Sequence, residues 1–252
     1  MIFSSLQFLI FWLFAFLISR VQKFNSSIII GIVGLFFYSF QGYFNFFVLF
    51  YVYLIVCIYN NFKKGLFFFI FLILLPLIII KYLNFILIDV LSLKSGFVFL
   101  ENLIIPPGLS FISFSAIALI FYLKNNLENF KINLAYLYLF PQLIAGPIVE
   151  PKSLIPQIKQ INLVKFDEIF SGIFIFSVGI SIKVFFADSI ANYIDPIFSN
   201  LENFEFKKKV VALFLFSQQI FFDFNGYTLM AIGIAKTFGI NLPENFNAPY
   251  LS

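Results

Sequence analysis

Eight long, almost uncharged apolar segments restrict the folds that this chain can adopt more than any motif does. They lie at roughly residues 6–19, 28–41, 44–59, 66–88, 103–123, 132–149, 169–187 and 208–240. Hydrophobic residues make up 62% of the chain and charged residues only 11%, which is far more apolar than a soluble domain. Because about 20 apolar helical residues cross the hydrocarbon core of a membrane, the sequence predicts an all-α, polytopic integral membrane protein.

The number of membrane spans follows from the lengths of these segments. Several segments are shorter than a full span, so tilted helices are expected. The last segment, 208–240, is too long for one membrane helix and contains residues that break helices. We therefore expect about seven to nine spans. The absence of an internal repeat or a flexible linker predicts a single domain over residues 1–252.

Basic residues are concentrated in alternate loops between the predicted spans. The first, third and fifth loops carry Arg20 with Lys23, Lys63 with Lys64, and Lys124 with Lys131. The second loop carries no charge, and the lysines of the fourth are offset by acidic residues. Loops rich in lysine and arginine stay in the cytoplasm, so the N-terminus is expected outside. No concentrated basic face indicates a nucleic-acid partner.

The residue inventory excludes several classes of enzyme chemistry within these 252 residues. The chain has no histidine and one cysteine, Cys57, so it contains no imidazole base and forms no internal disulfide. No phosphate-binding glycine loop, dinucleotide-binding motif or metal-ligand pattern is present. We therefore expect no metal site, and the groups left for chemistry are polar side chains within the apolar segments.

The most prominent of these polar groups lie in "QQIFFDFNGYTLMAIG", residues 218–233. Gln219, Asp223 and Tyr227 are four residues apart and share one face of a helix. An ionised carboxylate facing lipid costs roughly 2.5–3.5 kcal/mol, so this face should turn inward, with Asn225 and Gly226 beside it. The face is either the wall of a polar passage or a hydrogen-bonded cluster that holds helices together.

A second unusual segment, "FPQLIAGPIVEP" at residues 140–151, places three prolines and a glycine in an apolar setting. Irregular backbone at membrane depth is tolerated only where protein or a polar cavity surrounds it. We expect a broken or re-entrant element here, the alternative being a helix that ends just inside the interface. Lys183 is expected to extend toward the membrane surface. Asp188 is expected to cap a short helix that Pro196 stops, and Gly239 to end the last helix.

Five segments occur together in an order typical of one family. They are "PPGLSFISF" (106–114), "FPQLIAGPIVEP" (140–151), "GISIKVFFAD" (179–188), "FFDFNGYTLMAIGIAKTFGI" (221–240) and "PENFNAPYLS" (243–252). With these motifs the chain resembles the membrane-bound O-acyltransferases, and most closely their alginate O-acetyltransferase-like branch. Each motif alone would be weak, whereas the ordered set covers most of the chain.

The resemblance implies a ring of membrane helices around a central tunnel in a bacterial inner membrane. It also implies transfer of an acyl group, most simply acetyl, from acetyl-CoA or an acyl carrier to a hydroxyl of alginate or another exported polysaccharide. Membrane lipid, periplasmic or extracellular acyl-transfer proteins and the polysaccharide would be the partners, and no cofactor would be bound. The implied tunnel residues are Pro141, Gln142, Gly146, Pro147, Gln219, Asp223, Asn225, Gly226, Tyr227, Asn245, Pro249 and Tyr250.

The chain departs from the family pattern at its C-terminal end. The general base implied by the resemblance is a histidine that follows the "PENF" segment, and this chain contains none through Ser252. We therefore expect an N-terminal part of the acyltransferase domain that lacks its C-terminal catalytic part and is inactive alone. The alternatives are a transporter or channel subunit, which a polar helix face would also suit, and a non-catalytic membrane scaffold.

Overall fold

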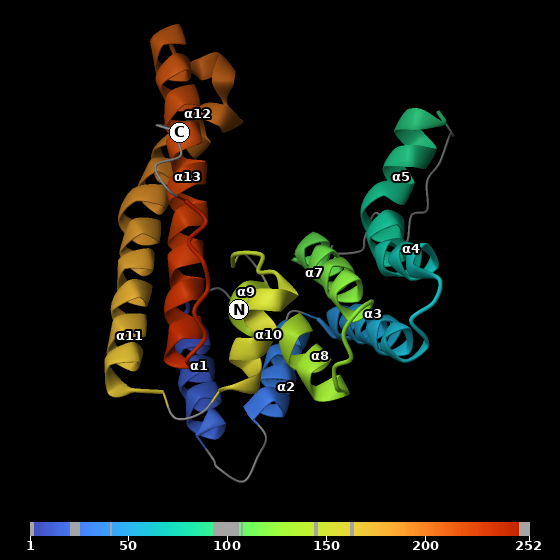
Figure 1. The fold of residues 1–252 in the computed structure, drawn as a ribbon. Helices are drawn as coiled ribbons and strands as arrows, with labels where there is room; N and C mark the ends of the chain where they lie inside the picture. The colour runs from blue at the N-terminus through green and yellow to red at the C-terminus, as the bar shows by residue number, and fades with distance from the viewer. Residues whose placement is uncertain are drawn as a thin grey trace. The chain divides into compact units, whose positions relative to one another are not determined.

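The structure, a computed structural model, describes residues 3–20, 26–40, 42–92, 106, 108–143, 146–161 and 164–246. All regular structure in these residues is helical, which confirms the all-α prediction for them (Figure 1). Two helical stretches, Phe44–Phe62 and Phe166–Ser199, are long and apolar enough to cross a membrane. Shorter apolar helices occur at Leu6–Ser19, Ser27–Ser39, Leu66–Tyr82 and Leu109–Leu123. The count of seven to nine spans stays a prediction.

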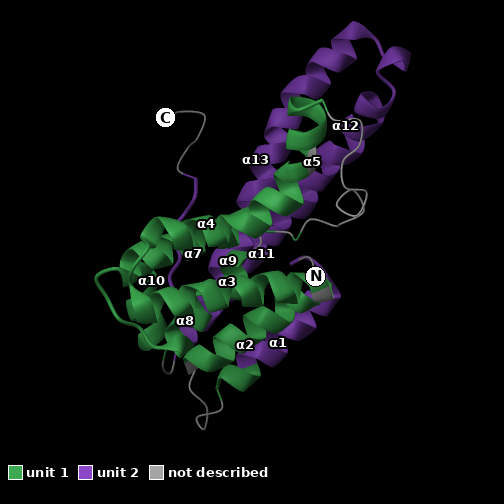
Figure 2. Cartoon of the chain, turned by 90° about the vertical axis from the view of Figure 1, so that its right-hand side faces the viewer, with its two compact units in different colours: residues 1, 17–144, 148–161 green, residues 2–16, 145–147, 162–252 purple. Residues whose placement is uncertain are grey.

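The chain divides into two compact units (Figure 2). Unit 1 contains Met1, Leu17–Ile144 and Ile148–Ile161, and unit 2 contains Ile2–Phe16, Ala145–Pro147 and Asn162–Ser252. Helix α1 (Leu6–Ser19) begins in unit 2 and ends in unit 1. Whether the two units form the expected single domain stays a prediction.

Unit 1 is built from helices that pack on one another. They are α2 (Ser26–Ser39), α3 (Tyr43–Phe62), α4 (Leu66–Leu77), η1 (Ile78–Tyr82), α5 (Leu83–Phe85), η2 (Ile86–Val90), α7 (Leu109–Leu123), α8 (Phe130–Leu137), α9 (Phe140–Leu143) and α10 (Pro151–Lys159). Helix α2 packs against α8 so closely that a Cβ atom on Gly34 would overlap the carbonyl of Tyr138. Helix α3 packs against α4 and α7.

The proline-rich segment 140–151 is broken, as its sequence predicted. Helix α9 has only four residues, the described residues from Gly146 to Glu150 are not helical, and α10 begins at Pro151. Proline suits the first turn of a helix because its missing N–H has no partner there. This confirms the break in the helix, while re-entry into a membrane stays a prediction.

Unit 2 centres on two long antiparallel helical stretches that lie side by side (Figure 1). The first runs without interruption through α11 (Phe166–Ser181), η3 (Ile182–Asp188) and α12 (Ser189–Ser199). After the short η4 (Leu201–Asn203), the second is α13 (Phe206–Thr237), a single helix of 32 residues. Helix α1 joins this unit through Trp12, whose Nε1 donates to Thr237 Oγ1 at 3.1 Å.

Two predictions for this part of the chain are wrong. Residues 208–240 were expected to break, but α13 continues to Thr237 because its glycines pack against α11 instead of bending the helix. Asp188 was expected to begin a new helix, but its backbone is already helical and its side chain makes no capping hydrogen bond. Pro196 lies inside α12, which ends three residues later at Ser199.

The predicted helix stop at Gly239 is confirmed. Gly239 has φ 80°, a left-handed conformation that glycine adopts without strain. Its N–H donates to Lys236 O at 3.0 Å, and the N–H of Ile240 donates to Ala235 O at 3.0 Å. This pair of bonds forms a Schellman motif, which satisfies carbonyls left open at the end of α13.

Four glycines determine how closely α11 and α13 approach. A Cβ atom on Gly172 would lie 2.7 Å from Gly233 O, and one on Gly179 would lie 2.8 Å from Gly226 O. The two glycines of each helix are seven residues apart, so they occupy the same face two turns apart. Small residues let helix backbones approach closely where lipid provides no hydrophobic drive for association. These contacts set the register of the pair.

Substituting Gly179 by alanine tests this contact. The new Cβ would lie 2.7 Å from Met230 N and 2.8 Å from Gly226 O, which are backbone atoms that cannot rotate away. Alanine favours a helix interior over glycine by about 1 kcal/mol, yet we expect the free energy of unfolding in mixed micelles to fall by about 1–3 kcal/mol because of overpacking. Ser177→Ala, on the exposed face of α11, is the control. A stabilised Gly179→Ala protein would contradict the close contact.

Candidate functional site

The ammonium group of Lys183 lies at the centre of a polar cluster in unit 2. Its Nζ lies 2.8 Å from Asp188 Oδ1 and 2.5 Å from Asp223 Oδ1. The same Nζ lies 5.4 Å from the centroid of the Tyr227 ring, within the range of a cation–π interaction. We call these four residues, Lys183, Asp188, Asp223 and Tyr227, the lysine cluster.

The π-helical segment η3 brings the first two members together. Lys183 and Asp188 are five residues apart, and the π-helix closes its turns between residues with this spacing. In a regular α-helix the same two positions would be offset by about 140° around the axis. Segments of π-helix often occur at functional sites. The unusual local geometry therefore creates the ion pair between Lys183 and Asp188.

Helix α13 supplies the other two members from one of its faces. Asp223 and Tyr227 are one turn apart, as their spacing predicted. Gly226 lies between them and faces the backbone of Lys183, where an added Cβ would lie 3.1 Å from Lys183 N. A larger residue at this position would push α13 away from η3. The glycine thus permits the contact between Lys183 and the two side chains beside it.

The lysine cluster holds one positive and two negative groups among apolar helices. The Lys183 side chain is 16% exposed, whereas those of Asp188 and Asp223 are 47% and 39% exposed. The ammonium is thus the most enclosed group, and two carboxylates stabilise its charge. Lys183 was expected simply to extend toward the membrane surface, and these two partners were not anticipated. The arrangement can offer fixed charges and hydrogen bonds to a polar group but contains no imidazole base.

Three further predicted residues of unit 2, namely Gln219, Asn225 and Asn245, lie on α13 or contact it. Gln219 is half-buried one turn before Asp223, and Asn225 is half-buried on α13. Asn245 is exposed and donates from Nδ2 to Thr228 Oγ1 at 3.2 Å, so the segment after Gly239 runs back along α13. Two further predicted residues, Pro249 and Tyr250, lie outside the described residues.

The predicted residues of segment 140–151 are buried. Pro141 and Gln142 belong to α9 in unit 1, and Gln142 lines a cavity of about 10 Å³ with Ser115 and Tyr136. This volume approaches the least that holds one water molecule. Gly146 and Pro147 are buried in the non-helical backbone and are grouped with unit 2.

Sequence reasoning missed Lys183 and Asp188 as members of the site. The signal that could have found them is their charge, because an intramembrane lysine needs an acidic partner and Asp223 needs a basic one. The spacing from Lys183 to Asp188 does not match an α-helical turn, so the pair could not be recognised from ordinary helix periodicity.

Comparison with known proteins shows that the chain is similar in sequence to bacterial acyltransferases. No protein-family model matches the chain. The chain is 41% identical over 127 residues to the peptidoglycan O-acetyltransferase of Helicobacter pylori, a match that covers 50% of the chain and 24% of that protein. It is 34% identical over 160 residues to the probable alginate O-acetylase AlgI of Pseudomonas aeruginosa, covering 61% of the chain and 30% of that protein.

A more distant relative is the teichoic acid D-alanyltransferase of Bacillus subtilis, which is 27% identical over 158 residues. That match covers 60% of the chain and 40% of the relative, so the chain spans between about a quarter and two fifths of these three proteins. The similarities confirm the resemblance to the membrane-bound O-acyltransferases. Together with the apolar helices they identify the chain as a membrane protein.

A double-mutant cycle tests the pair of Lys183 and Asp223. We expect a coupling of about 1–2 kcal/mol between Lys183→Met and Asp223→Asn in the free energy of unfolding, below the 3–5 kcal/mol of a fully buried pair because both groups are partly exposed. Asp195, an exposed aspartate of α12, provides the matched control, and Asp195→Asn should show no coupling to Lys183→Met. Equal and negligible coupling in both cycles would rule out the ion pair.

Proposed function

We propose that the chain is part of a membrane-bound O-acyltransferase that transfers an acyl group, acetyl in the simplest case, to a hydroxyl of an exported polysaccharide. The observation that carries this proposal is the 41% identity over 127 residues to a protein named peptidoglycan O-acetyltransferase. The similarity to probable alginate O-acetylases also supports a polysaccharide acceptor. Acetyl-CoA or an acyl carrier would supply the acyl group.

The lysine cluster would form part of the wall of the acyl passage. Its fixed charges lie among apolar helices, where intramembrane ionisable groups commonly mark substrate paths. A preformed group of donors and acceptors can orient a polar acyl donor or acceptor without reorganising at the moment of reaction. Because the chain contains no histidine, we assign to it the binding and positioning of substrate rather than the proton transfer.

The proposed location is a bacterial inner membrane, crossed seven to nine times around a central tunnel, with the N-terminus outside. Contacts between two lysine-bearing loops support this topology. Lys63 Nζ donates to Asn126 O at 2.9 Å, and Asn60 Nδ2 donates to Glu128 O at 2.6 Å. These bonds join the end of α3 to the loop after α7, as expected for two loops on the cytoplasmic side. Periplasmic or extracellular proteins would pass the acyl group onward.

Substituting Asp223 by alanine tests the proposed role of the lysine cluster. The complete reading frame that contains this chain would be expressed in a host without its own polysaccharide O-acetyltransferase, and alkali-released acetate would be measured. We expect acetylation to fall about a hundredfold, the effect of a displaced substrate, while the amount of protein in the membrane is unchanged. Asp195→Ala is the matched control and should retain activity.

The outcomes of this experiment separate the two parts of the proposal. Full activity in Asp223→Ala would reduce the lysine cluster to helix packing without affecting the assignment as an acyltransferase. No acetylation by the wild-type protein, in the presence of a polysaccharide acceptor, would contradict acyl transfer itself. That second result would favour a transporter subunit or a non-catalytic scaffold.

Cysteine labelling tests the proposed topology. Cys57 is the only cysteine, so Cys57→Ser provides a cysteine-free background. A cysteine introduced at Ser4 should react with a membrane-impermeant maleimide in intact spheroplasts. One introduced at Lys64 or Lys124 should react only after permeabilisation, because basic loops stay in the cytoplasm. The reverse pattern would overturn the proposed orientation.

A further inference from the structure

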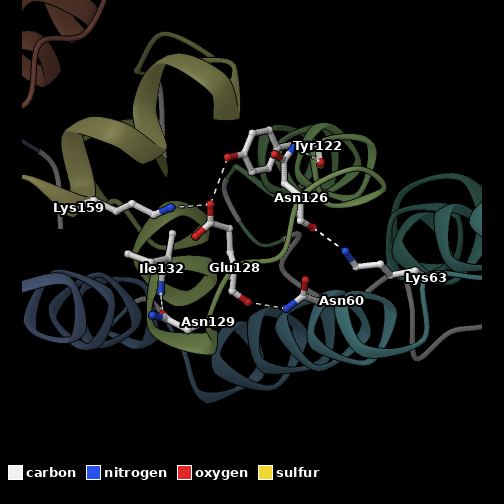
Figure 3. A network of polar contacts seen from close by, with 8 residues as sticks. All are labelled: Asn60, Lys63, Tyr122, Asn126, Glu128, Asn129, Ile132 and Lys159. Carbon is white, nitrogen blue, oxygen red and sulfur yellow. Dashed lines mark hydrogen bonds and ion pairs between the residues drawn. The ribbon is translucent and has the colours of Figure 1, made fainter.

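The loop between α7 and α8, residues 124–129, is held in place by a network of polar contacts in unit 1 (Figure 3). Its central residue is Glu128, whose side chain is only 6% exposed. Glu128 Oε1 accepts from Lys159 Nζ at 2.7 Å and from the Tyr122 hydroxyl at 3.1 Å. A buried carboxylate with these two donors forms a stable anchor for the loop.

Further bonds tie the loop to its neighbours. Asn60 and Lys63, at the end of α3, donate to the backbone carbonyls of Glu128 and Asn126. Asn129 Oδ1 accepts from Ile132 N at 3.0 Å and caps the start of α8. Figure 3 shows these residues between α3, α7 and α10. Three segments that are distant in the sequence are thereby joined at one end of unit 1.

Five lysines belong to this network or lie within two residues of its members in the sequence. We call them the basic rim: Lys63, Lys64, Lys124, Lys131 and Lys159. Lys64 and Lys124 are exposed, and the Lys159 side chain is 48% exposed although it pairs with Glu128. The carboxylate that the loop itself carries, that of Glu128, is buried and paired with Lys159. The exposed charge presented by the rim is therefore almost entirely positive.

Large apolar side chains alternate with these lysines. Phe62 precedes Lys63 and is 70% exposed, Leu127 is 72% exposed, and Phe130 is 57% exposed beside Lys131. Exposed apolar groups of this size next to basic residues are typical of the membrane interface. Lysine stems lie along apolar surface while their ammonium groups reach the headgroup layer.

We propose that the basic rim binds the phosphate headgroups of anionic phospholipids, while Phe62, Leu127 and Phe130 insert among the adjoining acyl chains. Charge complementarity favours an anionic over a zwitterionic lipid. The interleaved apolar residues favour a membrane over an acidic soluble partner, which would leave them exposed to water. The inference requires a membrane protein but does not depend on the proposed acyl transfer.

The buried network has a defined part in this proposal. It removes the charge of Glu128 from the lipid-facing surface and fixes the two loops that carry Lys63, Lys64 and Lys124. Each lysine near an anionic surface contributes roughly a fivefold gain in binding. Three such lysines together would change the binding of an anionic lipid by up to about a hundredfold.

Native mass spectrometry of the detergent-solubilised full chain tests the proposal. The protein would be mixed with equal amounts of phosphatidylglycerol and phosphatidylcholine that have identical acyl chains, and the ratio of retained lipids measured. We expect phosphatidylglycerol to be preferred, and Lys64→Gln/Lys124→Gln/Lys131→Gln to lower that preference at least about tenfold. Lys63 and Lys159 are left unchanged because they support the loop network.

The control carries the same change in charge elsewhere. Lys165, Lys208 and Lys236 are scattered over unit 2, and their triple glutamine variant should keep most of the preference. Replacing the three rim lysines by arginine should preserve it, which separates loss of charge from misfolding. An excess of inorganic phosphate should displace little phosphatidylglycerol, because free phosphate lacks the acyl chains.

Three results would overturn the proposal. The first is equal retention of the two lipids by the wild-type protein. The second is an equal loss of preference in the rim and control variants, which would show an effect of net charge alone. The third is full displacement by inorganic phosphate, which would indicate a site for a free anion rather than a lipid.

Discussion

The close approach of α11 and α13 is the constraint on which the rest of unit 2 depends. Gly172 faces Gly233 and Gly179 faces Gly226, and the equal spacing of the two pairs holds the helices in one antiparallel register. Lipid gives apolar helices no hydrophobic reason to associate, so close packing of small residues becomes decisive. This register places Gly226 against Lys183, and the side chains on either side of Gly226 then surround the ammonium group.

The two units use lysine in opposite ways. In unit 2, two aspartates and an aromatic ring surround Lys183, so its charge is retained inside the protein. In unit 1, Glu128 is the buried group, and its network leaves most neighbouring lysines facing outward. A charge among apolar helices is stable only when it is paired, whereas one at the headgroup layer has lipid phosphate as a partner. The proposed roles follow from this difference.

Sequence reasoning predicted the features of this fold that depend on local patterns. The face shared by Asp223 and Tyr227, the break in segment 140–151 and the helix stop at Gly239 all follow from spacing or backbone preference. It failed where the structural role of a residue depends on local geometry or on a contact with a residue distant in the sequence. Glycines in residues 208–240 were interpreted as breaks, but their contacts with α11 keep α13 continuous. The pairing of Lys183 with Asp188 requires a π-helix, which no apolar periodicity indicates.

The register of α11 and α13 brings Lys183 to Asp223 within unit 2. Rotational-echo double-resonance NMR on the full chain in lipid bilayers, with ¹⁵Nζ-lysine and ¹³Cγ-aspartate labels, measures this proximity directly. Strong dephasing from a short nitrogen–carboxylate distance is expected, in keeping with the 2.5 Å contact between Nζ and Oδ1. The signal should fall in Asp223→Asn, in which Asp188 keeps its contact with Lys183, and should be lost in Lys183→Met. Unchanged dephasing in these variants, or none in the wild-type protein, would contradict the contact between Lys183 and Asp223.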